Sequence, residues 1–259
     1  MRTHTETLRS TAGEPLFYRA WLPHAVRASV VLVHGLSEHS ERYDHVGRFL
    51  AERGIAVYAH DHLGHGRSGG PRGWVASFDH FLDDVGQMHR RVLAAHSGVP
   101  LFLLGHSMGG LIATAYVLER EPKPDFLILS GPAIAPLLDP GDRKIDASRL
   151  SKDSVVQKAY MDDPLVLRER VTDELFLRLA EGLALLPGRA GEVRMPCLLI
   201  HGDADMLCSA DGARAWLERS GNPDVTVKIY PGGRHEMFNE TNKDEVIADM
   251  WEWMKARLD

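Results

Sequence analysis

Cysteine is scarce in this sequence: its 259 residues include only two, Cys197 and Cys208. Two cysteines cannot build the multi-bridge scaffold that holds small secreted domains together. One disulfide between them is an alternative, but two reduced thiols in a cytosolic protein are the plainer interpretation. We therefore expect a cytoplasmic protein.

Long hydrophobic runs are absent as well. No apolar stretch approaches the ~18 residues that a membrane-spanning helix needs. The first residues, MRTHTETLRSTAGEP, lack the apolar segment of a signal peptide. Basic residues are not in excess, because the net charge is −6 and the lysines and arginines are scattered. We expect no nucleic-acid partner, and membrane contact that is peripheral at most.

What remains is the composition of a globular α/β protein. The chain is 44% hydrophobic and 25% charged, which is enough for a sizeable core in one large domain. Short apolar runs alternate with longer amphipathic segments, and this predicts βαβ units and a mainly parallel sheet flanked by helices. The predicted strands are Phe17–Leu22, Ser29–His34, Ile55–His60, Leu101–Gly105, Phe126–Ser130, Cys197–His201 and Val225–Tyr230. The predicted helices are Tyr43–Arg53, Phe78–His96, Gly109–Glu119, Ala210–Arg219 and Asp244–Leu258.

One interval, residues 134–194, interrupts this alternation. It contains no convincing strand, and near its start lies a stretch rich in Pro, Gly and Asp, APLLDPGDRKIDASRL. Apolar side chains then recur at helical spacing, broadened by two neighbours: Leu175, Leu179, Leu183 and Leu186, with Phe176 and Leu177. A structureless loop of ~60 residues is implausible inside a compact domain. We predict a helical insertion at 134–194 in a core domain formed by 1–133 and 195–259.

The strongest motif is G-x-S-x-G, at Gly105-His106-Ser107-Met108-Gly109. An apolar run precedes it and a helical pattern follows it. In this context the small residues allow a sharp strand-to-helix turn, which presents the serine hydroxyl at the N-terminus of a helix. The helix dipole there favours developing negative charge. Ser107 is therefore the predicted nucleophile, and a purely structural turn is the less favoured alternative.

A serine nucleophile needs a base, and the base needs an orienting acid. Two histidines follow Ser107, and His235 is the predicted base because it lies on a Gly-rich loop after a strand. His201 ends an apolar strand, so we expect it to pack or to hydrogen-bond locally.

The stretch HGDADMLCSADG offers three candidates for the acid. Asp211 begins the next helical pattern and is interpreted as a helix N-terminal acid. Asp203 suits a backbone-capping role in the turn. Spacing alone leaves Asp203 and Asp205 close to even.

A histidine-rich stretch, AHDHLGHGRSGG, raises the question of a metal site. Its ligand candidates are His60, Asp61, His62 and His65. Their spacing matches no metal-ligand pattern that can be defended, and a scaffold role also explains the glycines. We expect neither a metal nor a cofactor.

Several stretches together resemble one family. LVHGLSEHSERY, AHDHLGHGRS, LLGHSMGG, DDPLV, GDADMLC and GGRHEMFNE look like the landmarks of the monoacylglycerol lipases of the α/β-hydrolase superfamily, in that family's order. The resemblance covers almost the whole chain. G-x-S-x-G alone would indicate only the superfamily, whereas H-G-x-x-E-H-S and H-D-H-x-G-H-G-x-S narrow the assignment to this branch. It implies an α/β-hydrolase fold in which the insertion at 134–194 is a cap.

The resemblance also implies roles for residues of the catalytic centre. Asp205 matches the family's acid, which tips the choice away from Asp203. The backbone amides of Leu36 and Met108 match the two donors of the oxyanion hole. Cys208 becomes a thiol near the site with no assigned role.

For the head group of the substrate, the resemblance implies three binding residues. Glu38, Arg42 and Tyr160 match residues that hold glycerol in the family. Glu38 and Arg42 equally suit a structural ion pair near a helix N-terminus. Phe238 stands where animal relatives have a second histidine, so the polar end differs from theirs.

The resulting expectation is a serine ester hydrolase that cleaves monoacylglycerol to glycerol and fatty acid through an acyl-enzyme. The alternatives are a carboxylesterase or lysophospholipase with another head-group preference, and a non-catalytic hydrolase-like binding protein. The expected partner is a small lipid ester. Apolar residues of the cap would line an acyl tunnel, face a membrane surface or simply pack on the core.

Overall fold

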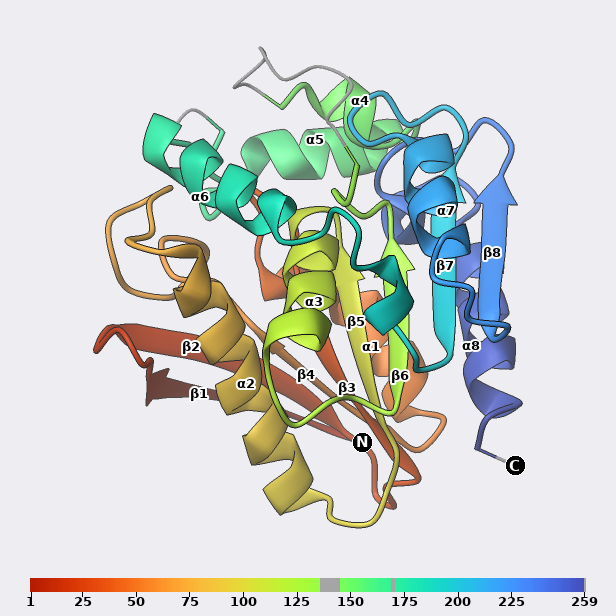
Figure 1. Cartoon of the computed structure of the whole chain (residues 1–259). Helices are drawn as coiled ribbons and strands as arrows, with labels where there is room; N and C mark the ends of the chain where they lie inside the picture. Colours follow the sequence, from red (N-terminus) through yellow and green to blue (C-terminus); the bar gives the residue numbers. More distant parts are fainter. Residues whose placement is uncertain (136–144, 169–170, 259) are drawn as a thin grey trace.

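The computed structural model describes residues 1–135, 145–168 and 171–258. Its centre is one eight-stranded sheet of order β1-β2-β4-β3-β5-β6-β7-β8 (Figure 1). In chain order the strands are β1 (Arg2–Arg9), β2 (Pro15–Leu22), β3 (Ala28–Val33), β4 (Ile55–His60), β5 (Leu101–His106), β6 (Phe126–Ser130), β7 (Cys197–Gly202) and β8 (Val225–Tyr230).

The six strands from β4 to β8 in this order run parallel, and β2 pairs antiparallel with both β1 and β4. Strands β3, β4, β5 and β7 are buried along their whole length, as expected for parallel strands covered on both faces. The register aligns Val33 with His60 and with Gly105, so these strands end level with one another. Loops that follow them therefore meet at one edge of the sheet, where parallel α/β folds place their ligands.

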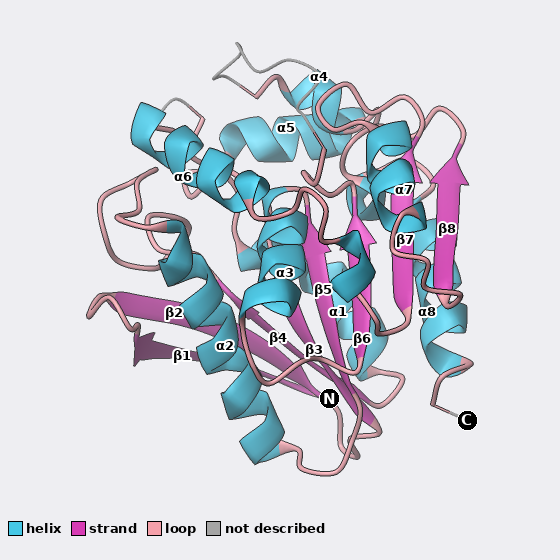
Figure 2. Ribbon diagram, viewed as in Figure 1, coloured by secondary structure: helices cyan, strands magenta, loops and turns pink. Residues whose placement is uncertain are grey.

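Helices cover both faces of the sheet (Figure 2). The longer ones are α1 (Asp44–Ala51), α2 (Phe78–Ala95), α3 (Met108–Glu119), α5 (Ser154–Asp162), α6 (Asp173–Ala184), α7 (Ala210–Glu218) and α8 (Lys243–Lys255). The short ones are η1 (Ser40–Tyr43), α4 (Ala147–Leu150), η2 (Ala190–Glu192) and η3 (Met237–Asn239). Helices α1 and α8 pack on one face around Leu50 and Met250. Helices α2, α3 and α7 pack on the other around Phe81, Ile112 and Trp216.

All the predicted strands and helices are present, with ends that differ by three residues at most. Strand β1 was not predicted, because RTHTETLR is polar and mostly exposed and lies at the edge of the sheet. Its strand conformation comes from pairing with β2 along eight residues, from Arg2 opposite Leu22 to Arg9 opposite Pro15. The helix predicted from Tyr43 begins instead with the 3-10 turn η1 at Ser40.

The interval 134–194 contains helices α4, α5 and α6, which lie over the carboxyl ends of the strands (Figure 1). Its described residues include no strand, and residues 136–144 of the Pro/Gly/Asp-rich stretch lie outside the described part. The leucine stripe packs into the main core: Leu175 and Leu186 are buried there, and Leu179 and Leu183 pack against it. The cap is thus anchored to the core along one face of α6. The boundaries 1–133, 134–194 and 195–259 remain a proposal.

Both cysteines are buried and free, so no disulfide joins them. In the part of the chain that the structure describes, no helix is both long and apolar enough to cross a bilayer.

Candidate active site

Ser107 occupies the sharp turn between β5 and α3. Its backbone has φ 54° and ψ −120°, which a non-glycine residue rarely adopts and which marks a strained position. The turn requires glycine on both sides. A Cβ on Gly105 would lie 2.3 Å from the Gly109 carbonyl oxygen, and one on Gly109 would lie 2.1 Å from the Val33 carbonyl oxygen. The G-x-S-x-G spacing therefore reflects close packing of β5, α3 and β3 around the serine.

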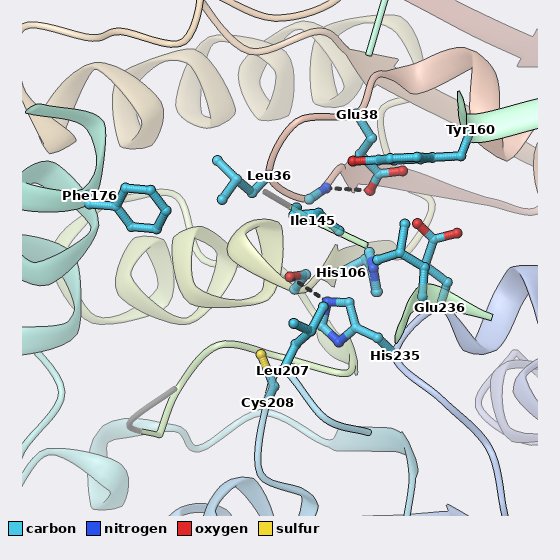
Figure 3. A pocket seen from close by; sticks show the side chains of 13 residues that line it. Leu36, Glu38, His106, Ile145, Tyr160, Phe176, Leu207, Cys208, His235 and Glu236 are labelled. Atoms are coloured by element: carbon cyan, nitrogen blue, oxygen red, sulfur yellow. Dashed lines mark hydrogen bonds between the residues drawn. The ribbon is translucent and has the colours of Figure 1, made fainter. Parts of the chain in front are cut away.

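His235 reaches Ser107 from the loop after β8. The Ser107 hydroxyl lies 2.8 Å from His235 Nε2 and donates a hydrogen bond to it in the resting state (Figure 3). On the other side of the ring, Nδ1–H donates to Asp205 Oδ2 at 2.8 Å. Since a carboxylate only accepts, this bond places the proton on Nδ1 and leaves Nε2 free to act as a base.

Asp205 lies in the loop after β7 and is buried. Its Oδ2 accepts from both His235 and His201, and its Oδ1 accepts from the amides of Leu207 and Cys208 at 2.8 and 3.0 Å. Burial raises the pKa of Asp205, but the charge of His235 and the hydrogen bonds from both histidines outweigh burial and hold that pKa well below its usual range. These contacts therefore favour the charged carboxylate form of Asp205.

The pKa of His235 responds to the same contacts with the opposite sign. Burial lowers it, but the charge and hydrogen bond of Asp205, with the charges of Glu236 and Glu38, raise it above the ordinary value. Hydroxyl, imidazole and carboxylate thus stand in the order that nucleophilic ester cleavage needs, and the imidazolium formed during the reaction would be stabilised.

The other two aspartates of this segment lie away from the histidine. Asp203 is exposed, and its Oδ1 accepts from the Gly232 amide at 2.6 Å, a contact that joins the β7 and β8 loops. Asp211 lies in the first turn of α7 and pairs with Arg214 on the surface. The structure therefore brings Asp205 to His235 and leaves Asp203 in a turn-capping position.

The amides of Leu36 and Met108 flank the serine. A Cβ on Gly35 would lie only 3.1 Å from Ser107 Cβ, so the peptide leading to Leu36 runs directly beside the nucleophile. Met108 is the first residue of α3. No acceptor among the described residues takes a hydrogen bond from either amide. Both are free to bind an oxyanion that forms beside Ser107.

The histidine-rich stretch contacts the end of β3, just before the loop that carries Gly35 and Leu36. His34 Nε2 accepts from the His62 amide at 2.9 Å, and the His34 and His62 rings pack with centroids 4.2 Å apart. His60 and His65 are also buried, and burial lowers the pKa of each to about 4, so both are neutral. These histidines join the ends of β3 and β4 beneath Gly35.

A cavity opens above Ser107 and His235 between the core and the cap (Figure 3). One group of lining residues is apolar: Leu36, Ile145, Leu150, Phe176, Leu207 and Cys208. The other group is polar or carries a polar tip: Glu38, His106, Tyr160 and Glu236. In the close-up, Phe176 and Leu36 lie to one side of the serine–histidine hydrogen bond, and Glu38, Tyr160 and Glu236 lie to the other. The cavity thus has an apolar end at Phe176 and Leu36. Its other end, here called the polar end, carries the polar groups of Glu38, Tyr160 and Glu236, although the apolar Ile145 and Leu150 pack with Tyr160 there.

At the polar end, the three head-group candidates take different positions. Glu38 and Tyr160 line the cavity, whereas Arg42 lies behind them and is not among the lining residues. The Arg42 guanidinium pairs with Glu38 at 2.9 Å and lies 4.9 Å from the centre of the Tyr160 ring. The Tyr160 hydroxyl is buried and has no partner among the described residues. The predicted Glu38–Arg42 ion pair is present, and Tyr160 offers a free hydroxyl.

Two polar lining residues, Glu236 and His106, were missed from the sequence. Glu236 forms a two-pronged ion pair with Arg42, which is 194 positions away in the chain, so no local pattern predicts it. Its position next to His235 was the one available signal. His106 donates from Nδ1 to the Ser130 carbonyl at 2.9 Å, and its ring lies 4.9 Å from that of His235. Burial lowers the pKa of His106 to about 3, so it is neutral beside the base.

Comparisons with known proteins identify the family of the chain. A family model described as serine aminopeptidase, S33, matches residues 24–141 and 135–242. The monoacylglycerol lipase of Mycolicibacterium smegmatis is 35% identical, with 95% of each chain covered. The human monoglyceride lipase is 32% identical, with 95% of this chain and 88% of that protein covered.

Among solved structures, a soluble variant of monoglyceride lipase from Saccharomyces cerevisiae superimposes with a TM-score of 0.87, covering 98% of this chain and 94% of that one at 23% identity. At that identity the likeness concerns the fold. The fold and the serine–histidine–aspartate arrangement define the class, an α/β-hydrolase. The chain belongs to the monoacylglycerol lipase family of this superfamily, and it is a carboxylic ester hydrolase.

Proposed function

We propose that the enzyme cleaves monoacylglycerols to glycerol and free fatty acid. The observation that carries this proposal is the arrangement of the cavity around the Ser107–His235 hydrogen bond. Phe176 and Leu36 lie on one side of this bond, and the polar groups of Glu38, Tyr160 and Glu236 lie on the other. An ester bound across this point would place its acyl chain against Phe176 and its neighbours. Its small polar alcohol would lie beside Glu38 and Tyr160.

The contacts of Ser107, His235 and Asp205 support the following catalytic roles. Ser107 attacks the ester carbonyl while His235 Nε2 accepts the hydroxyl proton, and Asp205 stabilises the imidazolium. The amides of Leu36 and Met108 hold the oxyanion, and one such donor is worth about 3–4 kcal/mol in a model protease. His235 then protonates the leaving alcohol, and the same histidine activates water to release the fatty acid.

Exposed apolar residues of the cap and of the loop after β7 support access from a lipid surface. Leu177 is 60% exposed and Met206 is 42% exposed, and each is the chain neighbour of a lining residue, Phe176 and Leu207. Val155 and Met161 on α5 are 74% and 45% exposed. Large apolar side chains in solvent are suited to contact with a membrane or a micelle.

The first test is the nucleophile itself. Ser107→Ala should reduce turnover of a short aryl ester by roughly a million-fold, because the covalent step is lost. Its circular dichroism and melting temperature should remain those of the parent. A fluorophosphonate probe should label the parent at Ser107 and leave the variant unlabelled. An unreactive serine in the folded parent would instead favour a non-catalytic binding protein.

The second test is the head group. Rates should be compared at matched concentration for monoacylglycerols of several chain lengths, diacylglycerols, lysophospholipids, simple aryl esters and an aminoacyl anilide. We expect the highest kcat/KM for a monoacylglycerol. If short aryl esters far outpace every monoacylglycerol, the enzyme is a general carboxylesterase. If the highest kcat/KM is found for a lysophospholipid or for the anilide, that compound class is the substrate class instead of monoacylglycerol.

A further inference from the structure

A buried chain of charges joins two loops of the site. Glu236 directly follows His235, and both of its carboxylate oxygens accept from Arg42, at 2.5 and 2.7 Å. Arg42 also donates to Glu38 Oε2 at 2.9 Å. The side chains of Arg42, Glu38 and Glu236 are only 9%, 3% and 4% exposed. We call these three residues the carboxylate bridge.

The Glu38 end of the carboxylate bridge holds the loop that carries Leu36, the proposed oxyanion donor. Glu38 Oε1 accepts from the Gly35 amide at 2.6 Å and from the Tyr43 hydroxyl at 2.6 Å. The Gly35 amide belongs to the residue immediately before Leu36, the proposed oxyanion donor. Ser37, on the other side of Leu36, has φ 65°, so the loop is held in a conformation that its sequence alone does not favour.

The Glu236 end of the carboxylate bridge holds the loop that carries His235. The Asn239 side-chain amide donates to Glu236 Oε2 at 3.0 Å, and the Glu236 backbone amide donates to the Leu150 carbonyl of the cap at 2.8 Å. Glu236 is therefore fixed at its backbone and at its carboxylate. Its position sets where Arg42, and through Arg42 the Glu38 carboxylate, can lie.

We propose that Glu236 is a positioning residue for the oxyanion hole: through Arg42 and Glu38 it fixes the Leu36 amide relative to Ser107 and His235. This inference rests on the proposed catalytic roles of those groups. It differs from them because Glu236 acts through the carboxylate bridge, without bonding to the oxyanion itself.

Stability alone does not account for this arrangement. Burying three charged groups carries a large desolvation cost, and apolar replacements of buried ion pairs often stabilise proteins. A charged bridge does fix geometry, since each carboxylate and the guanidinium accept or donate in defined directions. Displacement of a catalytic group by about 1 Å can reduce turnover by roughly a hundredfold. A rigid link between the base and the oxyanion donor addresses that requirement.

The test is Glu236→Gln, which keeps the size of the side chain and removes its charge. Active sites should be counted with a fluorophosphonate, and kcat and KM measured on a short aryl ester. The affinity of an arylboronic acid, which forms a tetrahedral adduct on the serine, should be measured as well. We expect kcat and boronate affinity to fall together by roughly tenfold, less than the ~100- to 1,000-fold loss of a whole oxyanion donor. KM should change by less than about twofold, because the substitution keeps the size of a side chain that lines the cavity and the expected loss falls on the transition state.

Glu240→Gln is the matched control. Glu240 is also buried, lies in the same segment and accepts from the amides of Lys152 and Arg234, but it has no contact with Arg42. We expect the melting temperature of Glu240→Gln to fall about as much as that of Glu236→Gln. Its kcat and boronate affinity should stay within about twofold of the parent.

A double-mutant cycle with Glu38→Gln completes the test. If both glutamates act through one bridge, the double variant should lose little more kcat than the worse single variant. Additive losses, or a Glu236→Gln enzyme with parental kcat and boronate affinity, would overturn the inference while leaving the proposed function intact. If Glu236→Gln does not fold, Glu236→Asp provides the same readouts, with partial loss expected. Absence of ester turnover in the parent would instead reject the proposed function.

Discussion

At the scale of single residues, Asp205 and Asp203 are two positions apart but differ in every contact. Asp205 is buried and accepts four hydrogen bonds, two of them from histidines. Asp203 is exposed and accepts from one backbone amide. The sequence could not separate them, because both follow the same strand and spacing does not show which carboxylate turns inward. The resemblance chose Asp205, and the geometry supports the same choice.

This choice makes a prediction for the two asparagine variants. Asp205→Asn should lower kcat for an aryl ester by roughly 1,000- to 10,000-fold, because the amide no longer stabilises the imidazolium or fixes its tautomer. Asp203→Asn should stay within about threefold of the parent, since an amide oxygen can still accept from Gly232. Steady-state kinetics on the purified variants measures both. A more damaging Asp203→Asn would show that the acid has been wrongly assigned.

At the scale of elements, the strands and helices with strong periodicity were predictable, and those decided by distant partners were not. Strands β5 and β7 are short apolar runs, so the sequence alone predicts them. Strand β1 is polar, and pairing with β2 alone makes it a strand. The role of Glu236 could not be predicted from the sequence for the same reason, because its partner Arg42 lies 194 positions away. Local patterns report propensity, and long-range contacts of this kind leave no local trace.

The junction of β5 and α3 provides a prediction at this scale. Gly109→Ala should destabilise the fold by about 3 kcal/mol and reduce activity, since a Cβ there would lie 2.1 Å from the Val33 carbonyl oxygen. Chemical denaturation followed by circular dichroism gives the free energy of unfolding. Gly191→Ala is the control, because the nearest atom to its Cβ would be 3.9 Å away. Equal stability of the two variants would contradict the packing argument.

At the scale of the whole molecule, one buried carboxyl couples stability to pH. Asp84 lies on α2 with both oxygens buried, and neither has a partner among the described residues. Burial, with a smaller contribution from the charge of Asp83, raises the pKa of Asp84 to about 8. The unfolded chain releases this proton near pH 4. The folded state therefore holds a proton that the unfolded state has lost, and stability should fall as pH rises from about 4 to about 8.

Asp84→Asn tests this coupling. In the parent, the Asp84 contribution should approach about 1.4 kcal/mol of lost stability per pH unit between about pH 5 and pH 7. The asparagine variant should lose that slope, because its amide does not titrate. Unfolding free energies at several pH values measure it. Asp211→Asn, at a side chain that is 89% exposed, should leave the slope unchanged. An unaltered slope in Asp84→Asn would show that Asp84 does not carry a proton in the folded state.

The order of the strands along the chain separates the proposed nucleophile from the proposed base. Ser107 follows β5 near the middle of the sheet, whereas His235 follows β8 at its edge, the last strand in chain order. A polypeptide emerging from the ribosome therefore carries the proposed nucleophile, Ser107, before it carries the proposed base, His235. On the proposed mechanism, ester cleavage begins only when β8 has joined β7.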